Sequence, residues 1–466
     1  MEESVALTDR WGEPTDTENR ASLDRFDRAV QGVVALRGDP LAEIRSATAA
    51  DPGFVFGHLL EALLLLYPMM RAQSQEALRC LARAEAALRP HTPARARGHL
   101  HAARAWSSGH WQDAAAAWEA VLLDHPRDLL AIKVLQDLYF FLGDAANMRD
   151  AVGRVLPSWS EGDSGYGHLL GMLAFGLEEN GDYQQAERLG RAAIARDAYD
   201  PWAHHAVAHV LEMQGRVADG IAFLSGGAPY WAESFFAVHN WWHLALYELD
   251  RGDGDAALDL YDGPMRGGAS DQLLDMVDAA ALLWRLKLVG FEAGHRRWRA
   301  LSKLWQPHAE DMVYCFNDAH AMIAFVGAGE EAQAEALRAR LAARALGQDS
   351  NAMMTREVGL PLAEALIAFG RGEDAEAADL LLAIRRKAHL FGGSHAQRDL
   401  IEQTLLAAAL RGGRRDLARA LAGERLGRKE TSPGNWRWMA RAWRSLGRAA
   451  QADAADRRAG ELARLN

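Results

Sequence analysis

Apolar and polar residues along this chain follow the pattern of helices. Alanine, leucine, arginine and glutamate, which favour helices, are abundant, and no run of alternating β-branched residues stands between turn signals. The most apolar run, 59–70, contains Glu61 and Pro68. It is shorter than the roughly 20 residues that cross a bilayer. The pattern therefore predicts an all-α protein in which this run is a buried helix, and it predicts no membrane partner.

A recurring pair of small residues indicates helical hairpins. An alanine stands seven residues before a glycine in Ala102/Gly109, Ala174/Gly181, Ala208/Gly215, Ala245/Gly252, Ala365/Gly372 and Ala440/Gly447. A second alanine often follows five residues after the glycine, at Ala114, Ala186, Ala257, Ala377 and Ala452. Small residues let two helices pack closely, and glycine ends the first of them. The pattern resembles tetratricopeptide repeats, whose hairpins stack into a superhelical solenoid.

The repeats predict one continuous domain over residues 1–466. Residues 98–264 carry the clearest repeats and a histidine-rich groove, and residues 271–466 carry degenerate repeats and a C-terminal cap. We expect 1–20 to be a loose N-terminal segment and 225–232, with its glycines and proline, to be a loop. The solenoid is expected to be either open or wound tightly around a central pocket.

Charge and composition exclude several partners. Lysine and arginine number 52 against 63 aspartate and glutamate, a net charge of -11, which disfavours nucleic acid. The two cysteines, Cys80 and Cys315, form neither a disulfide framework nor a thiolate metal site. The N-terminus shows no signal-peptide pattern, so a cytoplasmic location is expected. No glycine-rich phosphate loop stands between a strand and a helix, and we expect no nucleotide cofactor.

Histidines are the strongest candidates for chemistry. His205 and His209 are four residues apart, and so are His239 and His243, which places each pair on one helical face. Glu212 follows on the face of His205 and His209. In the register of tetratricopeptide repeats these residues line the concave groove, where two neighbouring helices can bring both pairs together.

Two histidine pairs and a carboxylate offer the ligands that Zn, Mn, Fe or Ni accepts, so His205, His209, His239 and His243 are candidate metal ligands. The run from His205 to His209 is not the HExxH protease motif, because Ala206 replaces its glutamate. Two alternatives stay open. The histidines can act in acid–base or substrate-binding chemistry without a metal, or they can serve as packed polar residues between helices.

Two further runs, 316–320 and 392–399, concentrate polar groups. Asp318 and His320 join the histidines and Glu212 as candidate catalytic residues, and Asp318 or Asp399 is expected to orient a histidine ring. Arg398 is expected to bind an anionic group of a ligand. The candidate substrate-binding residues are His168, Glu178, Asn240, Trp242, Asn317, His395 and Arg398.

The same runs resemble the tetratricopeptide repeat protein 38 family, in its bacterial members. The resemblance rests on 171–179, 202–216 with the run HAVAHVLEMQGR, 239–247, 278–286, 316–320 and the run GGSHAQRD at 392–399. It covers nearly the whole chain and implies an array of tetratricopeptide-like hairpins. It implies no particular activity.

Three functions follow as hypotheses. The first is an enzyme of hydrolase, lyase or isomerase type, whose pocket of histidine and tryptophan binds a small polar ligand and works by acid–base or metal-assisted chemistry. The second is a non-catalytic scaffold that binds a protein or peptide in its groove, where Lys133, Asp137 and His99 are also expected to lie. The third is a structural protein, with a homodimer formed through a terminal hairpin.

Overall fold

The computed structural model describes residues 7–268 and 270–465, and every regular element among them is a helix. The all-α prediction is confirmed. Packing divides the chain into two compact units, one made of 7–206, 233–236 and 348–351, and the other of the remaining residues. The division runs through one helix, α11 (Pro201–Met213), between Ala206 and Val207. The single continuous domain over 1–466 and the tightly wound pocket therefore stay predictions.

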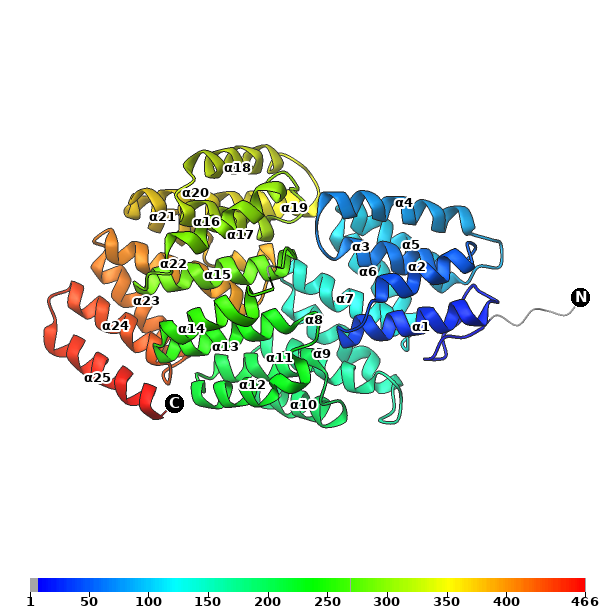
Figure 1. The fold of residues 1–466 in the computed structure, drawn as a ribbon, viewed down its shortest axis with the longest axis horizontal. Coiled ribbons are helices and arrows are strands. Elements are labelled where there is room, and N and C mark those ends of the chain that lie inside the picture. The colour runs from blue at the N-terminus through cyan, green and yellow to red at the C-terminus, as the bar shows by residue number, and fades with distance from the viewer. Residues whose placement is uncertain (1–6, 269, 466) are drawn as a thin grey trace, which may run out of the picture. The chain divides into compact units, whose positions relative to one another are not determined.

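The first unit consists of paired helices (Figure 1). They are α1 (Arg20–Ala35), α2 (Pro40–Ala50), α3 (Val55–Leu66), α4 (Arg71–Ala87), α5 (Ala94–Ser107), α6 (Trp111–Asp124), α7 (Leu129–Leu142), α8 (Ala145–Val155), α9 (Tyr166–Glu179) and α10 (Tyr183–Arg196). Each odd-numbered helix packs against the even-numbered helix that follows it, which is the hairpin expected from the sequence.

The second unit continues with longer and less regular hairpins. Its helices are α12 (Val217–Trp231), α13 (Ala237–Arg251), α14 (Gly254–Leu260), α15 (Leu273–Val289), α16 (His295–Trp305), α17 (Cys315–Ala328), α18 (Glu331–Arg344), α20 (Leu360–Arg371), α21 (Asp374–Ile384), α22 (His395–Arg411), α23 (Arg415–Arg428), α24 (Pro433–Ser445) and α25 (Ala449–Leu465), while α19 (Ser350–Met354) spans the division. Within this unit α13 packs on α15 and on α24, and α15 packs on α22. These contacts bring segments distant in sequence together.

The small-residue pattern works as the sequence predicts. The six alanines that precede the repeat glycines and the five that follow them are all fully buried. The glycines at 109, 181, 215, 252, 372 and 447 all have positive φ, the left-handed conformation in which a helix ends and a turn begins. Alanine therefore permits close helix contact, and glycine reverses the chain.

Two expectations differ from the structure. The predicted loop at 225–232 is instead helical as far as Trp231, because Trp231 is fully buried and Pro229 stands in the last turn of α12, where only a short stretch of helix follows the hydrogen bond that it cannot make. The expected loose segment 1–20 lies partly outside the described residues, but residues 7–19 pack against the fold. Trp11 is buried, and its indole N–H donates to the carbonyl of Ser164 at 2.8 Å.

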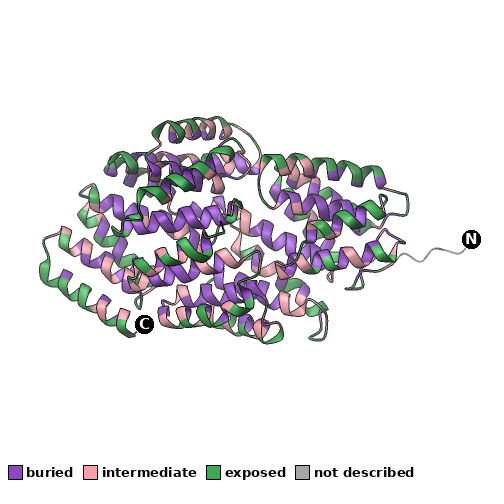
Figure 2. Cartoon of the chain, viewed as in Figure 1, coloured by how far each residue is buried: buried purple, intermediate pink, exposed green. Residues whose placement is uncertain are grey.

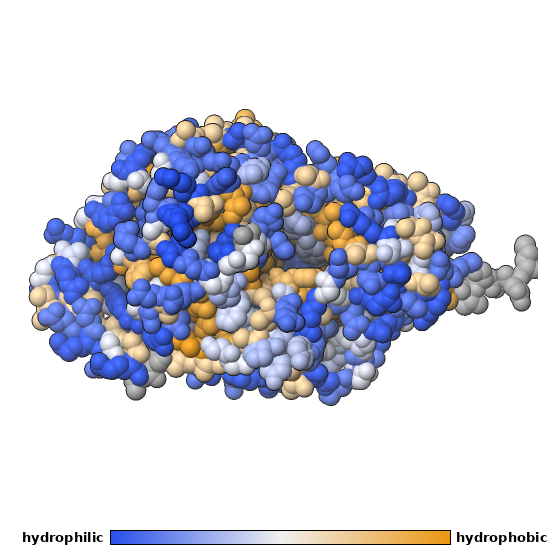
Figure 3. Space-filling model, viewed as in Figure 1, coloured by the Kyte–Doolittle hydropathy of each residue, from blue (hydrophilic) through white to orange (hydrophobic). Residues whose placement is uncertain are grey.

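Burial is uneven among the helices (Figure 2). Helix α15 is buried along most of its length, whereas α18 and α25 expose much of their surface. On the face drawn in Figure 3, hydrophilic side chains predominate over the outer helices. Among the described residues, no helix is long and apolar enough to span a membrane.

Candidate functional site

Three buried histidines meet in the second unit. His209 comes from α11, and His239 and His243 come from successive turns of α13. The rings of His209 and His243 lie 4.4 Å apart between centroids, and those of His239 and His243 lie 4.9 Å apart. One ligand nitrogen of each lies within 4.8 Å of the others. The predicted convergence of the two helical faces therefore holds for these three residues.

Two carboxylates fix the orientation of two of the rings. Nδ1 of His239 lies 2.9 and 3.0 Å from the carboxylate oxygens of Asp278 on α15. Nδ1 of His243 lies 3.2 Å from a carboxylate oxygen of Glu212 on α11. The second carboxylate oxygen of Glu212 lies 3.4 Å from Nζ of Lys429. Each of these two histidines thus has a carboxylate at Nδ1, which leaves Nε2 as the nitrogen it would offer to a ligand.

The electrostatic environment keeps one imidazole neutral. Burial lowers the pKa of His243 to about 3, and the neighbouring His209 adds to this shift. Burial by itself would raise the pKa of Glu212, but Lys429 and the hydrogen bond with His243 outweigh it, so the pKa of this carboxyl lies below its usual range. At neutral pH the pair is therefore an imidazole beside a carboxylate anion.

The indole of Trp242 packs against two of the three rings, His239 and His243. The indole of Trp242 stacks on the His239 ring at 5.1 Å and 19°, and the guanidinium of Arg285 lies 5.3 Å from the centre of the Trp242 ring. Trp242 and Asn240 are fully buried on α13. Trp242, a predicted substrate-binding residue, therefore packs against the ring of His239.

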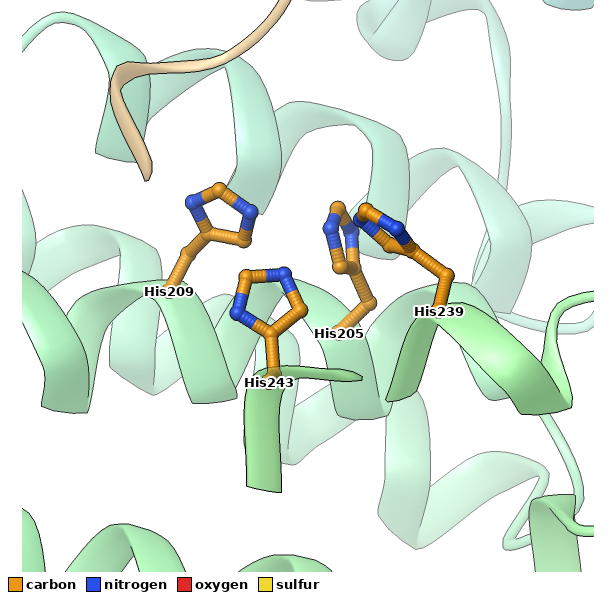
Figure 4. A group of neighbouring side chains, drawn as sticks. All are labelled: His205, His209, His239 and His243. Atoms are coloured by element: carbon orange, nitrogen blue, oxygen red, sulfur yellow. The ribbon is translucent and has the colours of Figure 1, made fainter. Parts of the chain in front are cut away.

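His205 stands one turn before His209 on α11 and is counted with the first unit (Figure 4). In that unit its ring lies between three aromatic side chains, 5.0 Å from Phe175, 5.0 Å from Trp202 and 4.9 Å from Phe236 between ring centroids. The same unit holds two predicted substrate-binding residues of α9. His168 pairs with Asp200 at 2.9 Å, and Glu178 is fully buried.

Helix α17 carries Asn317, Asp318 and His320. Nδ1 of His320 is 2.8 Å from the carbonyl oxygen of Phe316, one turn earlier on the same helix, and burial lowers the pKa of His320 to about 4. Burial raises the pKa of Asp318 to about 8, with Asp311 adding to the shift. Among the described residues Asp318 makes no hydrogen bond to a histidine, so the structure does not give it the orienting role that we expected.

The raised pKa of Asp318 predicts how the stability of the fold depends on pH. A carboxyl whose pKa is raised on folding stabilises the fold fully below its unfolded pKa of 3.8, and this contribution is lost as the pH rises through about 8. We expect Asp318→Asn to gain stability relative to the wild type between pH 4 and 8, at up to about 1.4 kcal/mol per pH unit, and then to level off. Urea unfolding across this pH range measures the difference, and a difference that does not change with pH would contradict it.

Residues 392–399 contain the start of α22 and contribute to the lining of a cavity outside the histidine site. Ser394 caps this helix by accepting from the backbone N–H of Gln397 at 3.2 Å. His395 and Arg398 line a cavity of about 230 Å³ in the second unit. Asp399, the other carboxylate expected to orient a histidine, instead pairs with Arg425, at 2.9 Å from Nη2.

Sequence reasoning missed three contributors to the histidine site, Asp278, Arg285 and Lys429. Asp278 and Arg285 carried a signal that could have found them. They are the only charged residues within 276–286, an otherwise apolar run of α15, and they stand seven residues apart on one helical face. A charged pair within an apolar helix is a recognisable signal of buried polar function. Lys429 gave no such signal, because it comes from the loop after α23.

Comparison with solved structures finds remote similarity to helical proteins. No family model matches the chain. A structure of the human IFIT1 dimer with PPP-AAAA is 15% identical at a TM-score of 0.43, and the alignment covers 97% of this chain and 96% of that one. Yeast Tom70 is 13% identical at 0.32, with 96% and 93% covered. A chain of the APC/C hetero-tetramer Cut9–Hcn1 is 12% identical at 0.36, with 95% and 89% covered.

Similarities with TM-scores this low carry no information about the ligands of this chain. The helical hairpins themselves are established by the geometry of the repeat alanines and glycines. The resemblance to the tetratricopeptide repeat protein 38 family stays a prediction.

Proposed function

We propose that this chain binds a divalent transition metal through His209, His239 and His243. The observation that carries the proposal is the carboxylate at Nδ1 of both His239 and His243. Histidines that bind metals commonly donate their second ring N–H to a carboxylate, which fixes the tautomer and makes the ligating nitrogen more basic. Histidines that only pack between helices do not need this arrangement twice at one place.

The ligand type selects the metal class. Imidazole nitrogens suit zinc, copper, nickel and iron, whereas calcium and magnesium prefer oxygen ligands. A histidine must be neutral to bind, and the low pKa of His243 means that this ring needs no deprotonation at neutral pH. His205, the fourth ligand predicted from the sequence, lies one turn from His209 on the same helix and stays a prediction.

The number of protein ligands determines the chemistry. Three histidines would leave an open position at which zinc activates water, as metal-assisted hydrolysis requires, whereas four would close a tetrahedral site. The proposed hydrolase, lyase or isomerase activity therefore belongs to the three-ligand state. Binding of a small polar ligand near the metal is part of the same proposal.

The alternative, a scaffold for a peptide, has less support from the residues expected to serve it. Lys133 is bonded to Asp137 at 2.6 and 2.7 Å, and His99 is bonded to Asp128 at 2.7 Å. All four side chains are buried. They satisfy one another within the first unit and are not presented to a peptide.

Metal content tests the proposal. Plasma mass spectrometry on protein purified without chelator should find about one zinc-class ion per chain in the wild type. The double variant His209→Ala, His243→Ala should contain none. The control is His320→Ala, which removes another buried histidine of the second unit, one bonded to a backbone carbonyl.

Circular dichroism separates loss of metal from loss of fold, because the helical signal must be the same in all three proteins. Equal metal content in the wild type and the double variant would reject the site. A metal-free wild type that does not take up added zinc, cobalt or nickel would do the same, and it would favour the scaffold.

A further inference from the structure

The first unit contains a cavity of about 580 Å³ that none of the candidate residues discussed above lines. Its wall comes from the C-terminal halves of α2 and α4, from α3, and from residues 52–53 between α2 and α3. The three helices pack in order, α2 on α3 and α3 on α4. The volume falls within the range of about 300–1,000 Å³ that is typical of pockets for small molecules.

Three arginines and one glutamate are the charged residues of this wall. Nε of Arg45 lies 3.0 Å from one carboxylate oxygen of Glu61, and Nη2 of Arg83 lies 3.2 Å from the other. The Glu61 side chain is buried, whereas those of Arg45 and Arg83 are about half exposed. Two guanidinium groups therefore share one carboxylate, which leaves one positive charge at this place.

The third arginine, Arg89, is held at a different place, where α4 ends. Its Nη1 donates to the carbonyl oxygens of Ala87 and Leu88 at 3.0 and 3.2 Å. Within the described part of the chain, Arg89 pairs with no carboxylate. The wall thus carries a second positive charge, separate from the group around Glu61.

The other acids of these helices do not cancel this charge. Each of those on α2 and α4 has an arginine outside the wall, and the pairs are Glu43 with Arg28, Glu76 with Arg79 and Glu85 with Arg104. Asp51, which follows α2 and is not part of the wall, accepts from the hydroxyl of Thr17 at 2.5 Å. Three cations against Glu61 leave an excess of two positive charges, and one remains if Asp51 is counted as well.

The arginines keep donors available on the cavity side of their hydrogen bonds. Among the described residues, Arg45 uses only Nε, on Glu61, and Arg89 uses only Nη1, on backbone carbonyls. Each of these guanidinium groups therefore retains two nitrogens that can donate to a ligand. A guanidinium can donate two parallel N–H bonds to one carboxylate, because the two planar groups match in geometry.

We propose that this cavity binds a small dicarboxylate. Two positive charges at separate places suit a ligand whose two anionic groups are joined by a short carbon chain, whereas a phosphate group concentrates its charge at one place. Small apolar residues of the wall, Ala49, Pro52 and Ala86, leave room for that carbon chain between the cations. A concave surface with an excess of one sign of charge also attracts ions of the opposite sign.

Calorimetric titration with succinate tests the proposal, with acetate and inorganic phosphate at equal ionic strength for comparison. We expect about one succinate to bind per chain, and acetate, which can engage only one of the two places, to bind at least about tenfold more weakly. Arg45→Ala and Arg89→Ala should each weaken succinate binding by about tenfold or more, the amount expected for a lost hydrogen bond to a charged group. Both residues are exposed, so neither change removes a buried side chain.

A third variant, Ala86→Leu, tests whether the ligand occupies the cavity itself. Ala86 is exposed and lines the cavity, so leucine there fills space and leaves every charge in place. Succinate should bind this variant more weakly than the wild type. Unchanged affinity would overturn the proposal, because it would mean that succinate binds outside the cavity.

The matched control is Arg79→Ala, which removes an exposed arginine of α4 that pairs with Glu76 outside the wall. Its affinity for succinate should equal that of the wild type. The same holds for the double variant His209→Ala, His243→Ala, since this site does not rest on the metal; loss of binding there would assign succinate to the histidines and overturn the proposal. No saturable binding at millimolar succinate, equally tight binding of acetate or phosphate, or unchanged affinity in the Arg45 and Arg89 variants would also overturn it.

Discussion

Replacing Asp278 by asparagine is expected to weaken zinc binding by about 10- to 100-fold, the range found when a residue that orients a metal ligand is changed. The carboxylate faces Nδ1 of His239 with both oxygens, at 2.9 and 3.0 Å, and is itself fully buried. Asparagine keeps the size and one acceptor oxygen but removes the negative charge that makes the imidazole more basic. Competition with a chromophoric zinc chelator measures the affinity.

Asp275→Asn is the matched control, because Asp275 is buried on the same helix one turn earlier and is not hydrogen-bonded to a histidine. Burial raises the pKa of Asp275 to about 6, so this carboxyl is still mostly ionised at neutral pH, and Asp275→Asn removes a nearby negative charge without removing the hydrogen bond to His239. The two variants should unfold at similar temperatures without metal. Equal zinc affinity in both would show that Asp278 does not support a ligand.

Zinc should also separate these two variants in thermal unfolding. A ligand that binds only the folded state stabilises it by about 2.7 kcal/mol at 100 times its dissociation constant, and this gain falls as the affinity falls. At a fixed zinc concentration, the Asp275 variant should therefore gain more stability than the Asp278 variant. A loss of stability in the Asp278 variant that is equal with and without zinc would indicate a structural role alone.

Local sequence spacing was sufficient to predict the hairpins. Helix packing needs a small residue at each close contact and a left-handed residue at each turn, so the alanine–glycine pattern repeats in the sequence itself. The histidine pairs were predictable for the same reason, because residues four apart share a helical face. Both inferences use contacts within one helix or between neighbouring helices.

The partners of those histidines depend on contacts that spacing does not encode. Asp278 reaches His239 because α15 packs on α13, and Lys429 reaches Glu212 over a separation of 217 residues. Asp318 was selected for standing near His320, yet the carbonyl of Phe316 takes that position on the ring. Proximity in sequence therefore does not identify the partner of a histidine ring, because a backbone carbonyl one turn earlier can take the position expected for a side chain.

The largest loss of stability is expected from Arg95→Ala in the first unit. This arginine is almost fully buried on α5, where Nε lies 2.6 Å from Asp128 and Nη1 lies 2.9 Å from Asp9. Removing it leaves two buried carboxylates without their cation, which costs about 3–5 kcal/mol for a buried pair. Urea unfolding followed by tryptophan fluorescence should show an earlier first transition.

The same change should release the N-terminal segment, because Nη1 of Arg95 also donates to the carbonyl of Pro14 at 3.1 Å. Limited proteolysis should therefore cut residues 7–19 faster in the variant than in the wild type. Arg104→Ala is the control on the same helix, since Arg104 pairs with a half-exposed Glu85 and such surface pairs contribute less than about 1 kcal/mol. Equal destabilisation by the two substitutions would mean that the buried ion pair contributes no more than a surface pair. Equal rates of cleavage at 7–19 would mean that the N-terminal segment is held by Trp11 and its apolar contacts instead.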